Sequence, residues 1–131
     1  MKALDTTASR IFIAILARLG NKDHVKINNS ESFMPVSVDR IFDGPDSLML
    51  SLAHNSVQNG DLMADPDMEF WIAPSGKIYP CAFRNDFMGL NQEAIFFEQG
   101  KPCCRPKLQA KLAAFANQWL RNIANQQGIE A

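Results

Sequence analysis

The sequence lacks the short motifs that mark the common nucleotide-binding and hydrolytic enzymes. It contains no GxGxxG, no P-loop, no GxSxG and no HExxH pattern. Each of these patterns fixes a phosphate cradle, a nucleophile or a zinc ion at a defined point of a fold. Their absence argues against nucleotide hydrolysis and against the common hydrolase chemistries.

Cysteine and histidine are scarce. The chain has three cysteines and two histidines, namely Cys81, Cys103, Cys104, His24 and His54. An odd number of cysteines without paired spacing predicts reduced thiols in a cytoplasmic protein, not a disulfide framework. Cys103 and Cys104 have basic neighbours, as a reactive thiol needs. No protease-type signature surrounds them, however, so we interpret all three as buried or incidental thiols.

A long hydrophobic run is also missing. The N-terminal apolar run, Ile11–Ala17, is too short to cross a bilayer, so we expect neither a membrane protein nor a secreted one. The 131 residues are 47% hydrophobic and carry a net charge of -1. This length and composition predict one domain, residues 1–131, with a core of its own. We expect no cofactor.

Two amphipathic helices are predicted at the ends of the chain. The first is capped by Asp5, Thr6 or Thr7, whose side-chain oxygens accept a free backbone N–H, and it ends at Leu19. The second begins at Pro106, a residue favoured in the first helical turn, and its apolar residues repeat at helical spacing. Glycine stops both helices, because it tolerates the left-handed conformation of a helix end.

Short alternating segments between the helices predict an antiparallel sheet. The predicted strands cover residues 24–28, 33–41, 48–54, 68–72, 78–83 and 93–97. A turn is expected at Asp43–Asp46 and a loop or short hairpin, not a tight two-residue turn, at Asn55–Pro66. The predicted class is α+β: an antiparallel sheet of five to six strands with an N-terminal and a C-terminal helix packed on one face.

Charge is strongly segregated along the chain. Ile41–Gly76 contains no Lys or Arg, whereas Lys101–Arg121 contains no acid. The acidic part could present phosphate-like charges to a basic partner, and the basic helix could touch nucleic acid or an acidic partner. The predicted partner-binding residues are Gln58, Asn59, Asp61, Asp65, Asp67 and Glu69. The predicted basic helix face consists of Lys107, Lys111 and Arg121.

The acidic stretch is also a candidate metal or ligand site. Hard cations prefer clustered oxygens, and the acids between Asp61 and Glu69 lie close in sequence. Their spacing does not match a calcium loop, and His54 has no second histidine nearby. We therefore favour a solvated acidic loop. The alternative is a polar cluster at one end of the sheet, made of His54, Asp61, Asp86 and Glu93.

Three segments carry a family resemblance. They are SLAHNSVQNGDLMADPDMEFWI, YPCAFRNDFMGLNQE and FANQWLRNIANQQG. Their pattern is a His followed by Gln-Asn-Gly-Asp-Leu-Met and Asp-Pro, then Asn-Asp-Phe-x-Gly, then Trp-Leu-x-Asn-Ile. It resembles a family of uncharacterised domains from plasmid- and phage-associated proteins. The matching positions are His54, Gln58, Asn59, Gly60, Asp61, Asp65, Pro66, Asp86, Phe87, Gly89 and Glu93.

The resemblance implies a mobile-element setting but no reaction. Small proteins of such elements often block host defence. Our first hypothesis is therefore a non-enzymatic protein that binds a host protein or nucleoprotein complex through its acidic surface. Such a partner would be a CRISPR or restriction component, as for an anti-CRISPR or antirestriction protein. One alternative is a metal- or ligand-binding enzyme-like domain, and another is a nucleic-acid-binding accessory protein.

Overall fold

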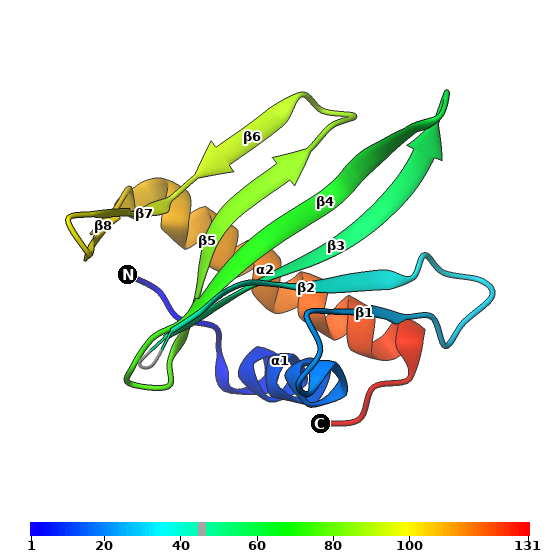
Figure 1. The fold of residues 1–131 in the computed structure, drawn as a ribbon, viewed down its shortest axis with the longest axis horizontal. Coiled ribbons are helices and arrows are strands. Elements are labelled where there is room, and N and C mark those ends of the chain that lie inside the picture. Colours follow the sequence, from blue (N-terminus) through cyan, green and yellow to red (C-terminus); the bar gives the residue numbers. More distant parts are fainter. Residues whose placement is uncertain (45–46) are drawn as a thin grey trace.

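The computed structural model describes residues 1–44 and 47–131, and in these a helix is followed by eight strands and a second helix (Figure 1). The elements are α1 (Thr6–Leu19), β1 (His24–Ile27), β2 (Val36–Asp43), β3 (Leu48–Gln58), β4 (Asp61–Ile72), β5 (Ile78–Asn85), β6 (Leu90–Glu93), β7 (Ile95–Glu98), β8 (Lys101–Cys104) and α2 (Pro106–Gln127). Strands β1 to β6 form one antiparallel sheet in chain order, and β7 pairs with β8. The predicted α+β class is confirmed. The turn expected at Asp43–Asp46 falls partly on residues 45–46, outside the described residues.

Both helices begin and end where the sequence signals lie. The side chain of Asp5 accepts a hydrogen bond from the N–H of Ala8 at 2.8 Å and so caps α1. Gly20, with a φ of 57°, ends α1, and Gly128, with a φ of 64°, ends α2. Pro106 occupies the first turn of α2. These boundaries confirm the predicted helices.

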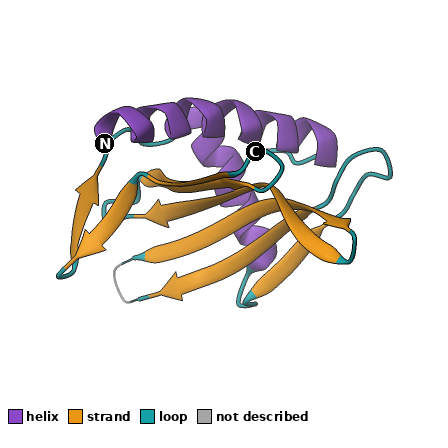
Figure 2. Ribbon diagram, turned by 90° about the horizontal axis from the view of Figure 1, so that it is seen from above, coloured by secondary structure: helices purple, strands orange, loops and turns teal. Residues whose placement is uncertain are grey.

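The main core lies between the helices and one face of the sheet, and a second, smaller buried cluster joins Trp71, Ala73 and Cys81 to Ile95 of the β7–β8 hairpin. Alternate residues of β3 and β4 point toward the helices, and Leu50, Leu52, Met68 and Phe70 have no exposed surface. The ring of Phe12 on α1 lies 5.1 Å from that of Phe70. Figure 2 shows α2 running along the sheet. Each such buried side chain stabilises the fold by about 1.5–3 kcal/mol, so this face provides most of the stability.

Two buried glutamines on α2 form hydrogen bonds with the backbone of distant segments of the chain. The amide of Gln109 accepts the Lys2 N–H at 2.6 Å and donates to the carbonyls of Lys2 and Pro80. Gln127 accepts the N–H of Asn29 at 2.8 Å. Buried polar groups must be paired in this way to avoid a desolvation penalty. The glutamines therefore hold the N-terminal segment and the region after β1 against α2.

A hairpin, one of the two options predicted for Asn55–Pro66, is present, but the exclusion of a tight two-residue turn is wrong. Strands β3 and β4 continue through it, and Gln58 pairs with Asp61 around a two-residue turn. That turn needs positive φ at both central positions, and Asn59 and Gly60 have φ values of 53° and 84°. The alternation of buried residues fades here because the hairpin tip stands clear of the helices (Figure 1). The paired Val57 and Leu62 are accordingly exposed.

The chain after β5 also differs from the prediction. A single strand was expected at 93–97, but Ala94 separates β6 from β7. The Ala94 N–H donates to the carbonyl of Cys81, and its own carbonyl accepts the N–H of Arg105. Gln99 and Gly100, both with positive φ, then turn the chain into β8. Strand β8 was missed because four residues that include a proline carry no alternating pattern.

Candidate functional site

The face of the sheet opposite the helices carries most of the polar strand residues. Its strands pair so that Asp39 lies beside Ser51, and Ser51 beside Glu69. Asp67 in turn lies beside Arg84 on β5. Because successive strand residues point to opposite faces, these side chains share the side away from the core. We call this side the open face.

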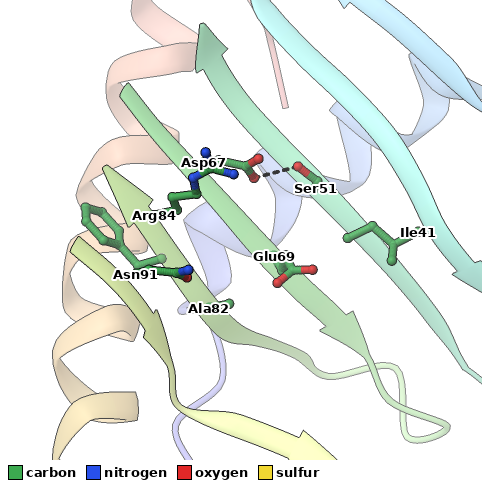
Figure 3. Close-up of a pocket in the computed structure, with 8 residues that line it drawn as sticks. Ile41, Ser51, Asp67, Glu69, Ala82, Arg84 and Asn91 are labelled. Carbon is green, nitrogen blue, oxygen red and sulfur yellow. Dashed lines mark hydrogen bonds between the residues drawn. The ribbon is translucent and has the colours of Figure 1, made fainter. Parts of the chain in front are cut away.

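A cavity of about 380 Å³ lies in the middle of the open face (Figure 3). We call it the acidic groove; its lining residues are Ile41, Ser51, Asp67, Glu69, Ala82, Phe83, Arg84 and Asn91. Asp67 and Glu69 project from β4 on the same side, and Arg84 reaches toward Asp67 from β5. The hydroxyl of Ser51 donates to Asp67 at 2.6 Å. Arg84 is itself occupied, since its Nε donates to Asp86 at 2.8 Å.

Partial burial shifts the two carboxyl groups of the groove. Burial raises the pKa of Asp67, while the Ser51 hydrogen bond and the Arg84 charge pull it back. Burial also raises the pKa of Glu69, and the charges of Asp67 and Glu93 raise it further. Within the described residues the carboxylate of Glu69 makes no hydrogen bond and no ion pair. Glu69 is thus a half-buried anion whose charged neighbours are anions, which suits it to hold a cation.

An apolar pocket of about 450 Å³ adjoins the groove on the open face. Its lining residues are Phe42, Ser47, Met49, Trp71, Phe97 and Gly100. Trp71 packs edge-on against Phe97, with ring centroids 5.2 Å apart. Met49 pairs with Trp71, and the next pair on the same face is Ser51 with Glu69. The apolar pocket and the acidic groove are therefore consecutive along β4.

The predicted partner-binding residues divide into two places. Gln58, Asn59 and Asp61 lie exposed at the tip of the β3–β4 hairpin. Asp67 is six residues farther along β4, which corresponds to about 20 Å of extended strand. Asp65, between them, accepts a hydrogen bond from the Asn85 amide at 3.4 Å. Of the six predicted residues, the structure brings Asp67 and Glu69 together in the groove.

The predicted polar cluster is dispersed. His54 is buried on the helix side, where its ring lies 5.5 Å from that of Trp119 and its Nδ1 is 3.1 Å from the Pro35 carbonyl. Asp61 is at the hairpin tip, whereas Glu93 is at the end of β6. Among the described residues no three His, Cys, Asp or Glu side chains are grouped to hold a metal ion. These residues do not meet at one end of the sheet.

Asp86, the fourth member of the predicted cluster, is a structural residue. Its carboxylate accepts the Ala64 N–H at 2.8 Å and pairs with Arg84. The Arg84 hydrogen bond, followed by the Ala64 hydrogen bond, lowers the pKa of Asp86. Asp86 thereby ties the start of the β5–β6 turn to β4 and remains ionised at neutral pH.

The basic helix face is partly engaged. Lys107 and Lys111 are exposed on α2, but Arg121 donates to Asp5 at 2.9 Å and to the Asn117 carbonyl. The cysteines are free. Burial, with a smaller contribution from Glu69, raises the pKa of Cys81 to about 12, so this thiol stays protonated and is a poor nucleophile.

Sequence reasoning missed the apolar pocket and the polar residues beside the acids. Trp71 lies two residues after Glu69, so the alternation of β4 already assigned both to one face. Phe97 could not be found in this way, because it comes from the β7–β8 hairpin. Ser51, Arg84 and Asn91 line the groove because their strands pair with β4 or with β5, and strand pairing could not be inferred from the sequence.

Comparison with known proteins identifies a family. The family model described as a domain of unknown function (DUF6908) matches residues 10–129. No curated protein and no solved structure matches the chain at a significant level. No helix among the described residues has the length and apolar character needed to cross a membrane.

Proposed function

We propose that this chain, which belongs to the DUF6908 family of domains of unknown function, is a non-catalytic protein-binding domain whose acidic groove accepts a basic surface of its partner. The observation that carries the proposal is the pair of half-buried carboxylates on the open face. Removing a carboxylate from water is costly unless a cation compensates it. A Lys or Arg from a partner would supply that compensation.

The surroundings of Glu69 support an external cation. Across the strands it faces Ser51 and Ala82, neither of which is charged. Arg84 is the nearest basic residue of the groove lining, and Asp86 holds its guanidinium. The chain therefore keeps an anion on its surface without neutralising it. Such an arrangement costs stability and is typical of a binding site.

The class of partner follows from the acidic character and from the resemblance to plasmid- and phage-associated domains. Proteins that bind nucleic acid present basic grooves, and an acidic surface is complementary to such grooves. We infer that the partner is a host CRISPR or restriction component, which the domain inhibits by occupying its basic surface. Cytoplasmic action is part of this proposal.

A capture experiment with matched variants tests this function. The tagged wild-type chain and a Glu69→Gln, Asp67→Asn double variant are incubated with host lysate, and retained proteins are quantified by mass spectrometry. Both substitutions preserve side-chain shape, and Asp67→Asn keeps an acceptor oxygen for Ser51. We expect a basic partner to be retained by the wild type, in a salt-dependent manner, and lost with the double variant.

Glu31→Gln is the control for the loss of a carboxylate outside the groove, because Glu31 is exposed in the segment between β1 and β2. Equal capture by the wild type, the control and the double variant would refute a role for the acidic groove. Capture of a protein with no nuclease or nucleic-acid function would refute the host-defence assignment while leaving the binding function in place.

Nucleic-acid binding through α2 is the second candidate. Lys107 and Lys111 are one helical turn apart and both exposed, so they form a small basic patch. This candidate predicts binding to DNA or RNA that weakens as salt rises. Absence of binding at low salt would dismiss it. The enzyme-like alternative has no comparable support, because its four polar residues are dispersed.

A further inference from the structure

We propose that the acidic groove and the apolar pocket together bind one extended, basic peptide segment in which an aromatic or aliphatic residue lies two positions from a Lys or Arg. This inference rests on the proposed function and deepens it, because it states what sequence the partner presents. The apolar side chain enters the pocket beside Trp71, and the cation lies against Glu69.

The spacing follows from the geometry of β4. Asp67, Glu69 and Trp71 alternate with core residues and therefore share the open face. Same-face residues of a strand repeat about every 6.6 Å. An extended peptide lying along β4 repeats its own side chains at the same interval. Residues two apart in the peptide therefore match Trp71 and Glu69, whereas residues three apart point to opposite sides.

The pocket is suited to a single large apolar side chain. Its volume of about 450 Å³ falls within the range of ligand sites in proteins. The residues Phe42 and Phe97 at its rim are 51% and 41% exposed. Uncovered aromatic rings beside a concave surface gain by taking up an apolar group. Trp71 packs against Phe97 and Tyr79 and is thereby held in place.

Charge complementarity selects a basic segment. Of the described residues that line the groove and the pocket, Arg84 alone is a cation, and its partner is Asp86. Asp39 and Glu93 flank the groove on neighbouring strands and add negative charge. A phosphate or an acidic peptide would be repelled, whereas a Lys or Arg makes a charge-assisted hydrogen bond with Glu69.

Peptides of equal composition test the spacing. The probe is fluorescein-labelled Gly-Ser-Lys-Ser-Phe-Ser-Lys-Ser-Gly, with Phe two positions from each Lys. Its isomer, Gly-Lys-Ser-Ser-Phe-Ser-Ser-Lys-Gly, places each Lys three positions away. We expect fluorescence anisotropy to show that the probe binds about tenfold more tightly than the isomer, as one well-placed charge-assisted hydrogen bond provides. Equal affinities would overturn the inference.

Two variants assign the two halves of the site. Glu69→Gln removes the charge, and Phe97→Ser removes an exposed ring from the pocket rim. Both should abolish the difference between probe and isomer, while Glu31→Gln should preserve it. Circular dichroism confirms that each variant is folded. A preference for the probe that survives either groove or pocket substitution would contradict the proposed contacts.

Other outcomes separate this inference from the proposed function. If capture from lysate requires Glu69 but the two peptides bind equally, the binding function stands and the spacing rule fails. If neither capture nor peptide binding requires Glu69, both fail. Sedimentation velocity tests whether the open face binds a second copy of the chain instead. A concentration-dependent dimer that the probe cannot dissociate would assign the open face to self-association and overturn the peptide site.

Discussion

The two faces of the sheet use the same strands for different purposes. On the covered face, Leu50 and Phe70 pair across β3 and β4 without any exposed surface. One residue along, Ser51 and Glu69 pair on the open face; both are polar, and Glu69 is half-buried whereas Ser51 is 8% exposed. Because strand residues alternate, each face can be changed with little effect on the other. The residues that stabilise the core are therefore separate, at the level of single residues, from those of the proposed binding site.

The two faces also differ in how their residues affect the stability of the fold. The covered face contains fully packed apolar side chains and paired glutamines, so burial there is favourable. The open face contains two carboxylates whose pKa burial raises, together with exposed aromatic rings. Groups that reduce stability without a structural purpose are expected at functional sites. This difference is the reason for assigning the partner to the open face.

The largest effect is expected from Phe70→Ala on the covered face. Phe70 has no exposed surface and packs against Phe12, so its truncation leaves a cavity. We expect a loss of about 3–5 kcal/mol in the free energy of unfolding, measured by urea denaturation. Ser51→Ala, on the open face of β3, should cost about 1 kcal/mol for the lost hydrogen bond to Asp67. Similar losses for both would break the distinction between the faces.

A smaller effect is expected from Gln109→Leu. The substitution leaves the buried Pro80 carbonyl without its partner, together with the N–H and the carbonyl of the exposed residue Lys2. Because Lys2 is exposed, the Pro80 carbonyl should account for most of the loss, which we expect to be about 1–3 kcal/mol in urea denaturation. Gln118→Leu is the control, because Gln118 is exposed on the same helix. Equal stabilities of the two variants would mean that the hydrogen bonds of Gln109 do not contribute to the stability of the covered side.

Much of the fold was predictable because its signals are local. Asp5 and Pro106 begin the helices, and the alternation in β2 and β3 marks the strands. The continuation of β3 and β4 to a two-residue turn was not predicted, because no helix covers the hairpin tip and burial therefore does not alternate there. The β7–β8 hairpin was not predicted, because strands of four residues are too short to show a clear alternation of apolar and polar residues. Both failures concern hairpins, whose strands pair locally but carry little alternation of apolar and polar residues.

The site was predictable only in part. Asp67 and Glu69 were named from charge alone, and the structure brings them into one groove. His54 follows Leu50 and Leu52 in the alternation of β3, so the sequence already indicates that its side chain lies on the covered face. Asp67 lies on the opposite face. The pocket beside Trp71 depends on Phe97, which a separate hairpin delivers. Sequence patterns assign residues to faces, but strand pairing decides which of them meet.

The faces also differ in their response to pH, and Glu69→Gln exposes this. The pKa of Glu69 is raised above 4.5 in the folded state, so the folded chain binds its proton more tightly than the unfolded chain. The stability from that proton is complete below the unfolded pKa and is lost as pH rises through the folded pKa. We therefore expect the melting temperature of Glu69→Gln to match the wild type in acid and exceed it at neutral pH.

Thermal unfolding of both proteins between about pH 3 and pH 8 measures this difference. The lowered pKa of Asp5 acts in the opposite direction in both proteins and cancels from the comparison. Glu31→Gln, at an exposed position, is the control for the loss of one carboxylate charge. A Glu69→Gln chain less stable than the wild type at neutral pH would mean that Glu69 already has a compensating cation within the chain.

The smallest effect is expected from neutralising α2, with Lys107→Ser and Lys111→Ser combined. Both lysines are exposed and make no ion pair within the described residues, so the free energy of unfolding should change by less than about 0.5 kcal/mol. Capture of a basic partner through the open face should also be unchanged. Loss of capture with this variant would move the site from the sheet to the helix and favour nucleic-acid binding. The variant thus separates recognition by the open face from recognition by surface charge in general, because it alters charge as much as the groove variant does.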